Sequence, residues 1–153
     1  MAATPYVAVV GAGGHVAPEL LASAEAVGAE LGRRGAVVVT GGLGGIMEAA
    51  CRGARGAGAT TLAILPGPDR ADANPFVAVA VATGMGELRN GLVVRCADAL
   101  IAVGGEYGTL SEIALALSAG TPVVGIGSWE IEGVRVAADA LEAVALVLDV
   151  AAA

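Results

Sequence analysis

Short apolar runs alternate with longer alanine- and leucine-rich segments along the whole chain. The short runs are rich in valine and almost continuously apolar, a pattern typical of parallel strands that are covered on both faces. They predict strands at residues 6–10, 36–40, 60–65, 76–82, 99–103 and 122–127. The longer segments predict helices at about residues 18–34, 45–57, 86–97, 109–119 and 134–149.

This alternation predicts an α/β fold, a doubly wound and mainly parallel sheet with helices on both faces, of the Rossmann-like kind. The chain has 153 residues and no linker or shift in composition, so residues 1–153 are expected to form a single domain. In such sheets the ligand lies at the carboxyl ends of the strands. The loops at 11–15, 40–45, 83–90 and 104–109 follow predicted strands, and three of them are rich in glycine. We therefore expect a nucleotide-binding domain.

The charged residues narrow the class of ligand. All 8 basic residues are arginine, against 15 acidic residues, and the net charge is −7. The absence of lysine excludes a P-loop and a Schiff base with pyridoxal phosphate. No basic block is present, so no nucleic-acid partner is expected. A small phosphorylated ligand fits the sequence better, because backbone amides at a helix N-terminus bind anions without net positive charge.

Cysteine and histidine give no sign of a metal site. Cys51 and Cys96 lie far apart in predicted helices, where we expect small core residues rather than a disulfide or metal ligands. His15 is the single histidine and is expected at a loop surface. No metal and no resident cofactor are predicted. The N-terminal segment lacks a basic region and the apolar stretches are broken by glycine and proline, so a soluble cytoplasmic protein without a membrane segment is expected.

The first glycine loop, "GAGGH", begins like the dinucleotide fingerprint G-x-G-x-x-G. Val16 stands where the third glycine belongs, and the second strand ends at Thr40 without the carboxylate that holds a ribose. An NAD(P) dehydrogenase is therefore not favoured. Gly11 and Gly13 allow two interpretations, a tight turn into a helix with Pro18 in its first turn, or contact with a ligand.

The stretch "VGGEYGTLSE" also has two interpretations. Thr109 and Glu112 fit the capping box S/T-x-x-E at the start of a helix. Alternatively, the free amides of the first helical turn bind a phosphate, and Gly105 and Gly108 let the backbone approach it closely. Glu112 would then face the ligand from one turn inside the helix.

Four segments, at residues 40–54, 63–67, 83–90 and 97–117, together resemble the Lonely Guy (LOG)-like Rossmann proteins. That group includes cytokinin-activating phosphoribohydrolases, proteins formerly mislabelled lysine decarboxylases, and molybdenum-cofactor carrier proteins. The resemblance implies a catalytic pair of Arg89 and Glu112. It also implies a pocket for the phosphorylated ligand, lined by Gly11, Gly13, Gly41, Gly42, Gly45, Gly105, Tyr107, Gly108 and Thr109.

Three positions depart from the phosphoribohydrolase signatures. Asn90 replaces a lysine, Gly104 a proline and Glu106 a glycine, and these changes bring the chain closer to the carrier-like branch. Glu106 would repel a phosphate, so it is expected to face solvent, to pair with an arginine or to bind a metal together with the phosphate. Trp129 is expected to pack in its loop or to stack on a ligand.

The leading functional hypothesis is hydrolysis of the N-glycosidic bond of a nucleoside 5′-monophosphate, which yields a free base and ribose 5-phosphate. Glu112 would stabilise the oxocarbenium-like sugar or orient water, as in glycoside hydrolysis. The alternatives are a non-catalytic carrier of molybdenum cofactor or a related phosphorylated ligand, and a nucleotide-sensing module. The resemblance also implies a homodimer or larger homo-oligomer, for which the apolar helices at 112–119 and 140–150 are candidates.

Overall fold

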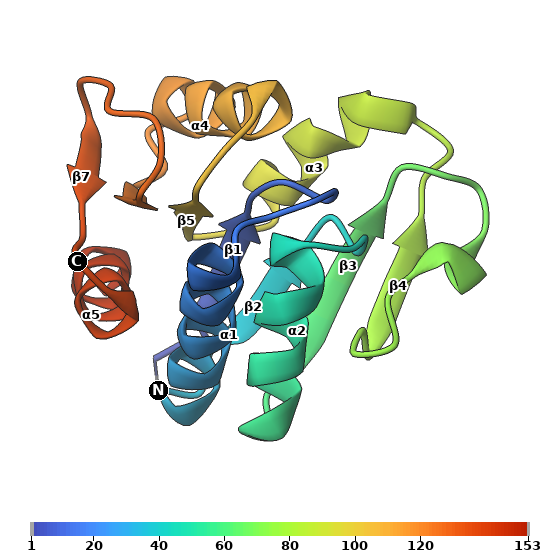
Figure 1. Ribbon diagram of the computed structural model, residues 1–153, viewed down its shortest axis with the longest axis horizontal. Helices are drawn as coiled ribbons and strands as arrows, with labels where there is room; N and C mark the ends of the chain where they lie inside the picture. The colour runs from blue at the N-terminus through green and yellow to red at the C-terminus, as the bar shows by residue number, and fades with distance from the viewer. Residues whose placement is uncertain (1, 153) are drawn as a thin grey trace.

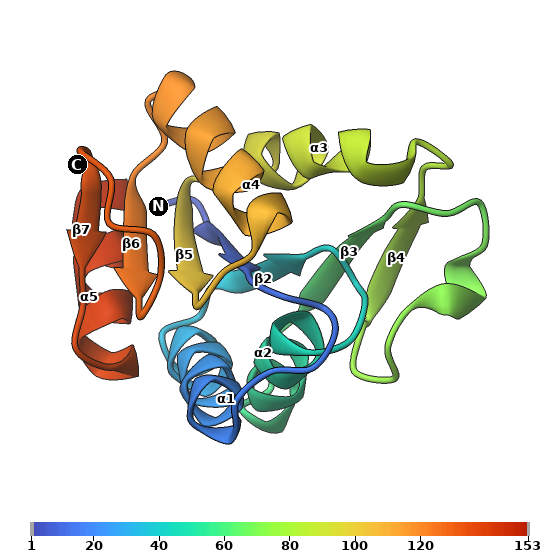
Figure 2. The same cartoon turned by 45° about the horizontal axis from the view of Figure 1, so that its top comes forward.

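The computed structural model describes residues 2–152, which form an open sheet with helices packed on both of its faces (Figure 1). Figure 2 shows α3 and α4 on one side of the sheet and α1 and α2 on the other. The elements in chain order are β1 (Tyr6–Val10), α1 (Pro18–Arg33), β2 (Val37–Thr40), α2 (Ile46–Gly56), β3 (Thr61–Leu65), the short 3₁₀ helix η1 (Arg70–Asp72), β4 (Val79–Ala82), the 3₁₀ helix η2 (Gly86–Arg89), α3 (Asn90–Arg95), β5 (Ala99–Val103), α4 (Tyr107–Ser118), β6 (Val123–Ile126), β7 (Val134–Val136) and α5 (Ala140–Ala151). This is the predicted Rossmann-like architecture.

All strand pairs in the described sheet are parallel, and their order is β4-β3-β2-β1-β5-β6-β7. The chain moves outward from β1 through β2 and β3 to β4, then crosses to the other side of β1 and continues through β5. Strands β1 and β5 are therefore the point where the winding direction reverses, and Val9 lies opposite Ile101 there. The loops that follow these two strands diverge to opposite faces of the sheet, which opens a crevice between them.

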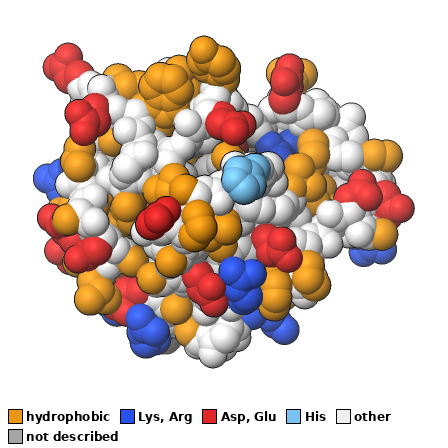
Figure 3. Space-filling view, in the orientation of Figure 1, with side chains coloured by type: hydrophobic (Ala, Val, Ile, Leu, Met, Phe, Trp, Pro, Cys, Tyr) orange, Lys and Arg blue, Asp and Glu red, His pale blue; other side chains and the backbone are white. Residues whose placement is uncertain are grey.

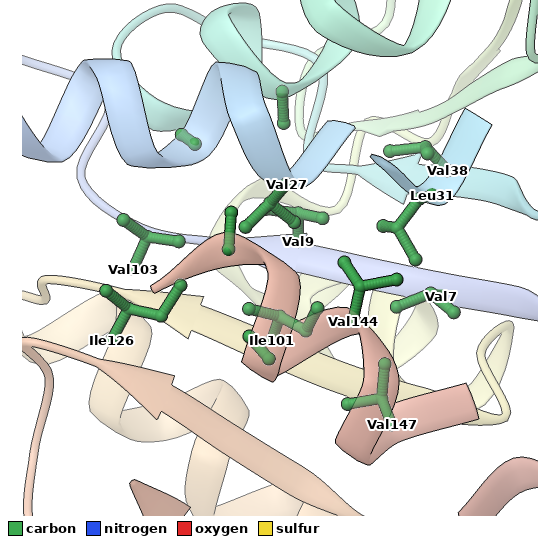
Figure 4. Packing of buried hydrophobic residues seen from close by; sticks show 14 of the residues in the cluster. Val7, Val9, Val27, Leu31, Val38, Ile101, Val103, Ile126, Val144 and Val147 are labelled. Atoms are coloured by element: carbon green, nitrogen blue, oxygen red, sulfur yellow. The ribbon is translucent and has the colours of Figure 1, made fainter. Parts of the chain in front are cut away.

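The core consists of two apolar layers, one on each face of the sheet. In β1, Val7 and Val9 point toward α1, α2 and α5 (Figure 4), whereas Ala8 and Val10 belong to the cluster on the α3 and α4 side. Because successive side chains of a strand point to opposite faces, both alternate sets must be apolar. This accounts for the unbroken apolar runs that predicted the strands.

Helices α1 and α2 are in direct backbone contact. A Cβ atom added at Gly28 would lie 2.0 Å from the carbonyl oxygen of Ala50, and one added at Gly53 would lie 2.0 Å from that of Glu25. Each glycine is therefore required by the closeness of the opposite helix. The start of α2 is joined to the first glycine loop by a separate contact, in which the Ile46 amide donates to the Ala12 carbonyl oxygen at 3.0 Å.

The end of the chain differs from the sequence prediction. Residues 134–136 of the predicted helix form the edge strand β7, and α5 begins only after Asp139, whose carboxylate accepts a hydrogen bond from the Glu142 amide at 2.9 Å. The β-branched Val134 and Val136 favour a strand, and the aspartate cap fixes where the helix starts.

Two smaller differences concern the middle of the chain. The predicted helix at 86–97 is divided into η2 and α3, and Cys96 at its end is exposed, so the expectation of a core residue there was wrong. Cys51 is buried in α2 as expected, and its burial raises the pKa of its thiol. No helix within residues 2–152 is long and apolar enough to cross a membrane.

Candidate functional site

A cavity of about 120 Å³ lies at the carboxyl ends of the central strands, where the winding direction reverses. Its walls combine three glycine-containing loops, the first turn of α4 and the junction of η2 with α3. The lining residues are Val9, Val10, Gly11, Ala12, Gly13, Gly41, Met47, Arg89, Asn90, Glu106, Gly108, Thr109 and Glu112. The fold thus places in one crevice residues that are up to about a hundred positions apart in sequence.

The first two glycine loops support one another. A Cβ atom at Gly11 would lie 2.6 Å from the Ile46 side chain, and one at Gly45 would lie 2.2 Å from the Ala12 carbonyl oxygen. Gly45 also has a φ of 61°, which a residue with a side chain adopts only with strain. The glycines therefore allow close packing of one loop on the other, and the backbone itself forms this wall of the cavity.

Helix α4 begins earlier than predicted. Its N-cap is Glu106, and Thr109 is the third helical residue, whose hydroxyl oxygen accepts a hydrogen bond from the Glu106 amide at 3.4 Å. The predicted capping box with Thr109 as the N-cap was therefore wrong by three positions. This shift releases Glu112 from a capping role and leaves it one turn inside the helix, buried against the cavity.

Arg89 is the cationic side chain among the described lining residues, and only 8% of its surface is exposed. Its Nε donates to the Ile64 carbonyl oxygen at 2.9 Å, and one terminal nitrogen donates to the Gly41 carbonyl oxygen at 3.4 Å. The other terminal nitrogen donates to the Asn90 amide oxygen. Burial lowers the pKa of Arg89, although the charge of Glu112 acts in the opposite direction. Arg89 therefore ties the second glycine loop to β3 and still carries N–H groups that can bind an anion.

Glu112 is 7% exposed, and its burial raises the pKa of its carboxyl group to about 7. The positive charge of Arg89 opposes this shift but does not cancel it. At neutral pH the group is therefore divided between its neutral and ionised forms. A carboxyl group in this state can give or accept a proton, or donate a hydrogen bond to a bound anion.

A chain of hydrogen bonds connects Arg89 to the start of α4. The Asn90 side-chain amide donates to the Ser111 hydroxyl at 3.3 Å, and this hydroxyl donates to the Gly108 carbonyl oxygen at 2.6 Å. Asn90 thus fixes the junction of η2 and α3 against α4. Sequence reasoning treated Asn90 only as a departure from a signature, because its partner Ser111 is 21 residues away and no local pattern indicates the contact.

An aromatic groove adjoins the cavity. The Tyr107 and Trp129 rings stack with centroids 6.2 Å apart and planes inclined by 28°, and the Trp129 Nε1 donates to the Glu106 carbonyl oxygen at 3.3 Å. Together with Glu106 and Gly108 they line a volume of about 360 Å³. Glu106 and Gly108 also line the central cavity, so the two spaces adjoin.

The structure gathers most of the expected site residues around the central cavity, namely Gly11, Gly13, Gly41, Arg89, Gly108, Thr109 and Glu112. Four others lie outside its lining. Gly42 packs against Leu65 and Gly45 against the first loop, whereas Tyr107 faces the aromatic groove. Gly105 lies beneath Trp129, in a shallow depression on the His15 side of the loop.

Glu106 and His15 are both exposed. For His15 this agrees with the expectation of a loop-surface residue. The ion pairs found within residues 2–152 join other glutamates to arginines and do not include Glu106. In the same residues no group of three or more His, Cys, Asp and Glu side chains is arranged to hold a metal ion. Glu106 therefore takes part in none of these ion pairs, and its carboxylate faces the Thr109 backbone amide in the capping box of α4, where the cavity meets the groove.

The fold and the crevice define a Rossmann-like protein of the LOG-like group. The chain belongs to the SLOG cluster4 family, whose model matches residues 4–151. A relative from Archaeoglobus fulgidus, described as an uncharacterized protein, is 44% identical over 131 residues, which is 85% of each chain.

Two solved structures are similar over almost their whole length. The molybdenum cofactor binding protein from Rippkaea orientalis is 31% identical with a TM-score of 0.92, and the match covers 97% of this chain and 98% of that one. The Moco carrier protein from Chlamydomonas reinhardtii is 35% identical with a TM-score of 0.89, and the match covers 98% and 99%. These likenesses agree with the resemblance inferred from the sequence.

Proposed function

We propose that this protein binds a phosphorylated small molecule with a planar ring and serves as a carrier of molybdenum cofactor or a closely related pterin. The observation that carries this proposal is a glycine-lined cavity that adjoins an aromatic groove and shares Glu106 and Gly108 with it. The cavity suits a phosphate, which backbone amides and Arg89 can hold, and the groove suits a planar ring. At about 120 Å³ the cavity is smaller than an ordinary ligand pocket, so the ring would lie outside it.

The contacts of Arg89 support binding more than turnover. All three nitrogens of its guanidinium already donate to protein oxygens, so moving it toward a leaving group would break the link between β3 and the second glycine loop. The position beside it holds Asn90, whose side chain is also engaged in hydrogen bonds. The likeness to two molybdenum-cofactor proteins above 30% identity supports the same proposal.

One observation favours a second candidate, hydrolysis of the N-glycosidic bond of a nucleoside 5′-monophosphate. The Glu112 pKa of about 7 lies where a general acid or base is most effective, and the cavity holds Glu112 and Arg89 together. In this mechanism the phosphate occupies the glycine loops. Glu112 stabilises the oxocarbenium-like ribose or orients the attacking water, and Arg89 holds the phosphate or ribose.

The two functions predict different results for the same purified protein. The chain would be expressed in a host that makes molybdenum cofactor and in a matched host blocked in its synthesis, and bound pterin would be oxidised and measured by fluorescence. The carrier proposal predicts pterin only from the first host. In parallel, nucleoside monophosphates, including N6-modified adenosine monophosphate, would be incubated with the protein, and free base and ribose 5-phosphate would be measured. Release of base that depends on Glu112, without bound pterin, would favour the hydrolase.

We also propose that the chain self-associates through the surface formed by η2, α3 and α4. Leu88 is 74% exposed and Leu115 is 44% exposed, and the two line one shallow depression. Figure 3 shows large apolar side chains at the surface over α4. Helix α5 is a weaker candidate because Val144 and Val147 are buried in the core of the same chain. Contiguous exposed apolar surface is typical of protein interfaces.

A further inference from the structure

Glu106 is the acidic residue that touches both parts of the proposed binding crevice. It lines the central cavity and the aromatic groove, it is exposed, and it takes part in none of the described ion pairs. Its carboxylate faces the Thr109 backbone amide in the capping box of α4, which leaves further acceptor positions on its two oxygens for a ligand. A carboxylate in this position opposes a phosphate nearby. The phosphate would therefore occupy the glycine-lined end near Gly11 and Gly13, and the uncharged part of the ligand would lie beside Glu106.

We infer that Glu106 selects a planar ring carrying a ring N–H next to an exocyclic amino group, as guanine and pterin rings do. A carboxylate accepts two parallel hydrogen bonds, and these rings present two N–H donors side by side. Hypoxanthine lacks the amino group, and lumazine carries an oxygen in its place. Adenine presents an acceptor nitrogen at the corresponding edge. This inference rests on the proposed function and adds the class of ring that the same site recognises.

The aromatic residues hold Glu106 and a stacking surface together. The hydrogen bond from the Trp129 Nε1 ends on the Glu106 carbonyl oxygen, and the Trp129 ring stacks on Tyr107, the next residue. Tyr107 is 83% exposed, so much of its ring surface is free to contact a ligand. A planar ring packed against this pair would have its edge near the Glu106 carboxylate, where stacking and hydrogen bonding act on the same group.

The test compares ligands that differ at the amino group. Isothermal titration calorimetry would measure binding of GMP, IMP and AMP, and of pterin and lumazine, to the 153-residue protein. We expect GMP to bind roughly 10- to 100-fold more tightly than IMP and AMP. Pterin should bind more tightly than lumazine by a similar factor. Glu106→Gln should reduce GMP binding to the level of IMP. Glu130→Gln removes an exposed carboxylate next to Trp129 in sequence and should change neither ratio.

The outcomes separate this inference from the proposed function. If GMP and IMP bind equally tightly and both are displaced by ribose 5-phosphate, the phosphate site stands and the role of Glu106 is refuted. If no phosphorylated ligand binds, both proposals fail. The comparison of GMP with IMP uses only the unmodified protein, so its result does not depend on whether a variant folds. Thermal unfolding of Glu106→Gln would be followed by circular dichroism. An unfolding temperature equal to that of Glu130→Gln excludes misfolding as the cause of weaker binding.

Discussion

At the scale of single residues, Glu112 is an acidic group whose burial strongly changes its protonation equilibrium. Its carboxyl group is buried beside the cavity, and its pKa rises from about 4.5 to about 7. The folded protein therefore holds this proton more tightly than the unfolded chain does. The contribution of Glu112 to stability declines as pH rises from about 4.5 to about 7 and stays constant above that range.

The variant Glu112→Gln tests this linkage. Because glutamine does not ionise, the variant should be more stable than the unmodified protein by about 2–3 kcal/mol at pH 8, and the two should converge near pH 4.5. Urea denaturation at several pH values measures the difference. Glu130→Gln, at an exposed position, serves as the control and should show no such pH dependence. Equal stability of Glu112→Gln and the unmodified protein at pH 8 would contradict the assignment.

Arg89 gives a second prediction at this scale. A Cβ atom at Gly41 would lie 2.5 Å from a terminal nitrogen of Arg89 and 2.9 Å from the sulfur of Met47. Gly41→Ala should therefore displace the guanidinium and weaken phosphate-dependent binding by roughly tenfold or more. At Gly14 an added Cβ meets nothing within 4 Å, so Gly14→Ala is the matched control. Titration with ribose 5-phosphate measures both, and equal affinities would show that Arg89 does not shape the site.

Residues with local or patterned signals could be assigned to one crevice from the sequence, and the structure brings most of them together there, while their roles stay predictions. Arg89 and Glu112 were recognised from motifs, and the cavity brings them together. Glu106 was recognised as unusual but not as the start of α4, because the Thr109–Glu112 spacing also satisfies a capping box. Met47 lines the cavity from α2 and has no signal in the sequence, since a methionine in an apolar helix normally predicts only core packing.

At the scale of secondary-structure elements, the order of strands and helices could be read from the apolar runs, whereas some boundaries could not. Edge strand β7 is half exposed and only three residues long, so its pattern is too short to separate from the helix that follows. The split between η2 and α3 depends on tertiary contacts of Arg89 and Asn90, which no local pattern encodes. Central strands, buried on both faces, were predicted best.

The packing of α1 on α2 gives a prediction at this scale. Gly53→Ala would bring a Cβ atom to 2.0 Å from the Glu25 carbonyl oxygen and 2.9 Å from the Ala29 nitrogen, and backbone atoms cannot rotate away. We expect a loss of about 1–3 kcal/mol in the free energy of unfolding, or more if the helices separate. Gly56→Ala, in the same helix with nothing within 4 Å, should be neutral or stabilising by up to about 1 kcal/mol. Thermal denaturation measures the stability of both variants. Equal stabilities of Gly53→Ala and Gly56→Ala would contradict the close contact between α1 and α2.

At the scale of the whole molecule, the exposed apolar surface of η2, α3 and α4 predicts self-association. Leu115→Glu places a charge in that surface, whereas Leu141→Glu alters an equally apolar side chain on α5 that is 63% exposed. We expect the first variant to shift the protein toward the monomer and the second to leave the assembly unchanged. Light scattering after size-exclusion chromatography measures the mass. A monomer in the unmodified protein, or an assembly unaffected by Leu115→Glu, would refute this interface.

The parallel sheet, the reversal between β1 and β5, and the adjoining cavity and groove lie at the end of the molecule where we propose that the ligand binds. The central claim is that this crevice binds a phosphorylated pterin. Gly108 lines the cavity and the groove, and an added Cβ there meets nothing within 4 Å, so Gly108→Leu fills the crevice without straining the fold. Gly56→Leu adds the same side chain in open space on α2.

The most direct measurement is the amount of pterin per chain that co-purifies with these two variants and the unmodified protein from a host that makes molybdenum cofactor. We predict pterin on the unmodified protein and on Gly56→Leu at equal levels, and a loss of at least roughly tenfold on Gly108→Leu. Equal pterin on all three proteins, or none on the unmodified protein, would contradict the claim that this crevice is the carrier site.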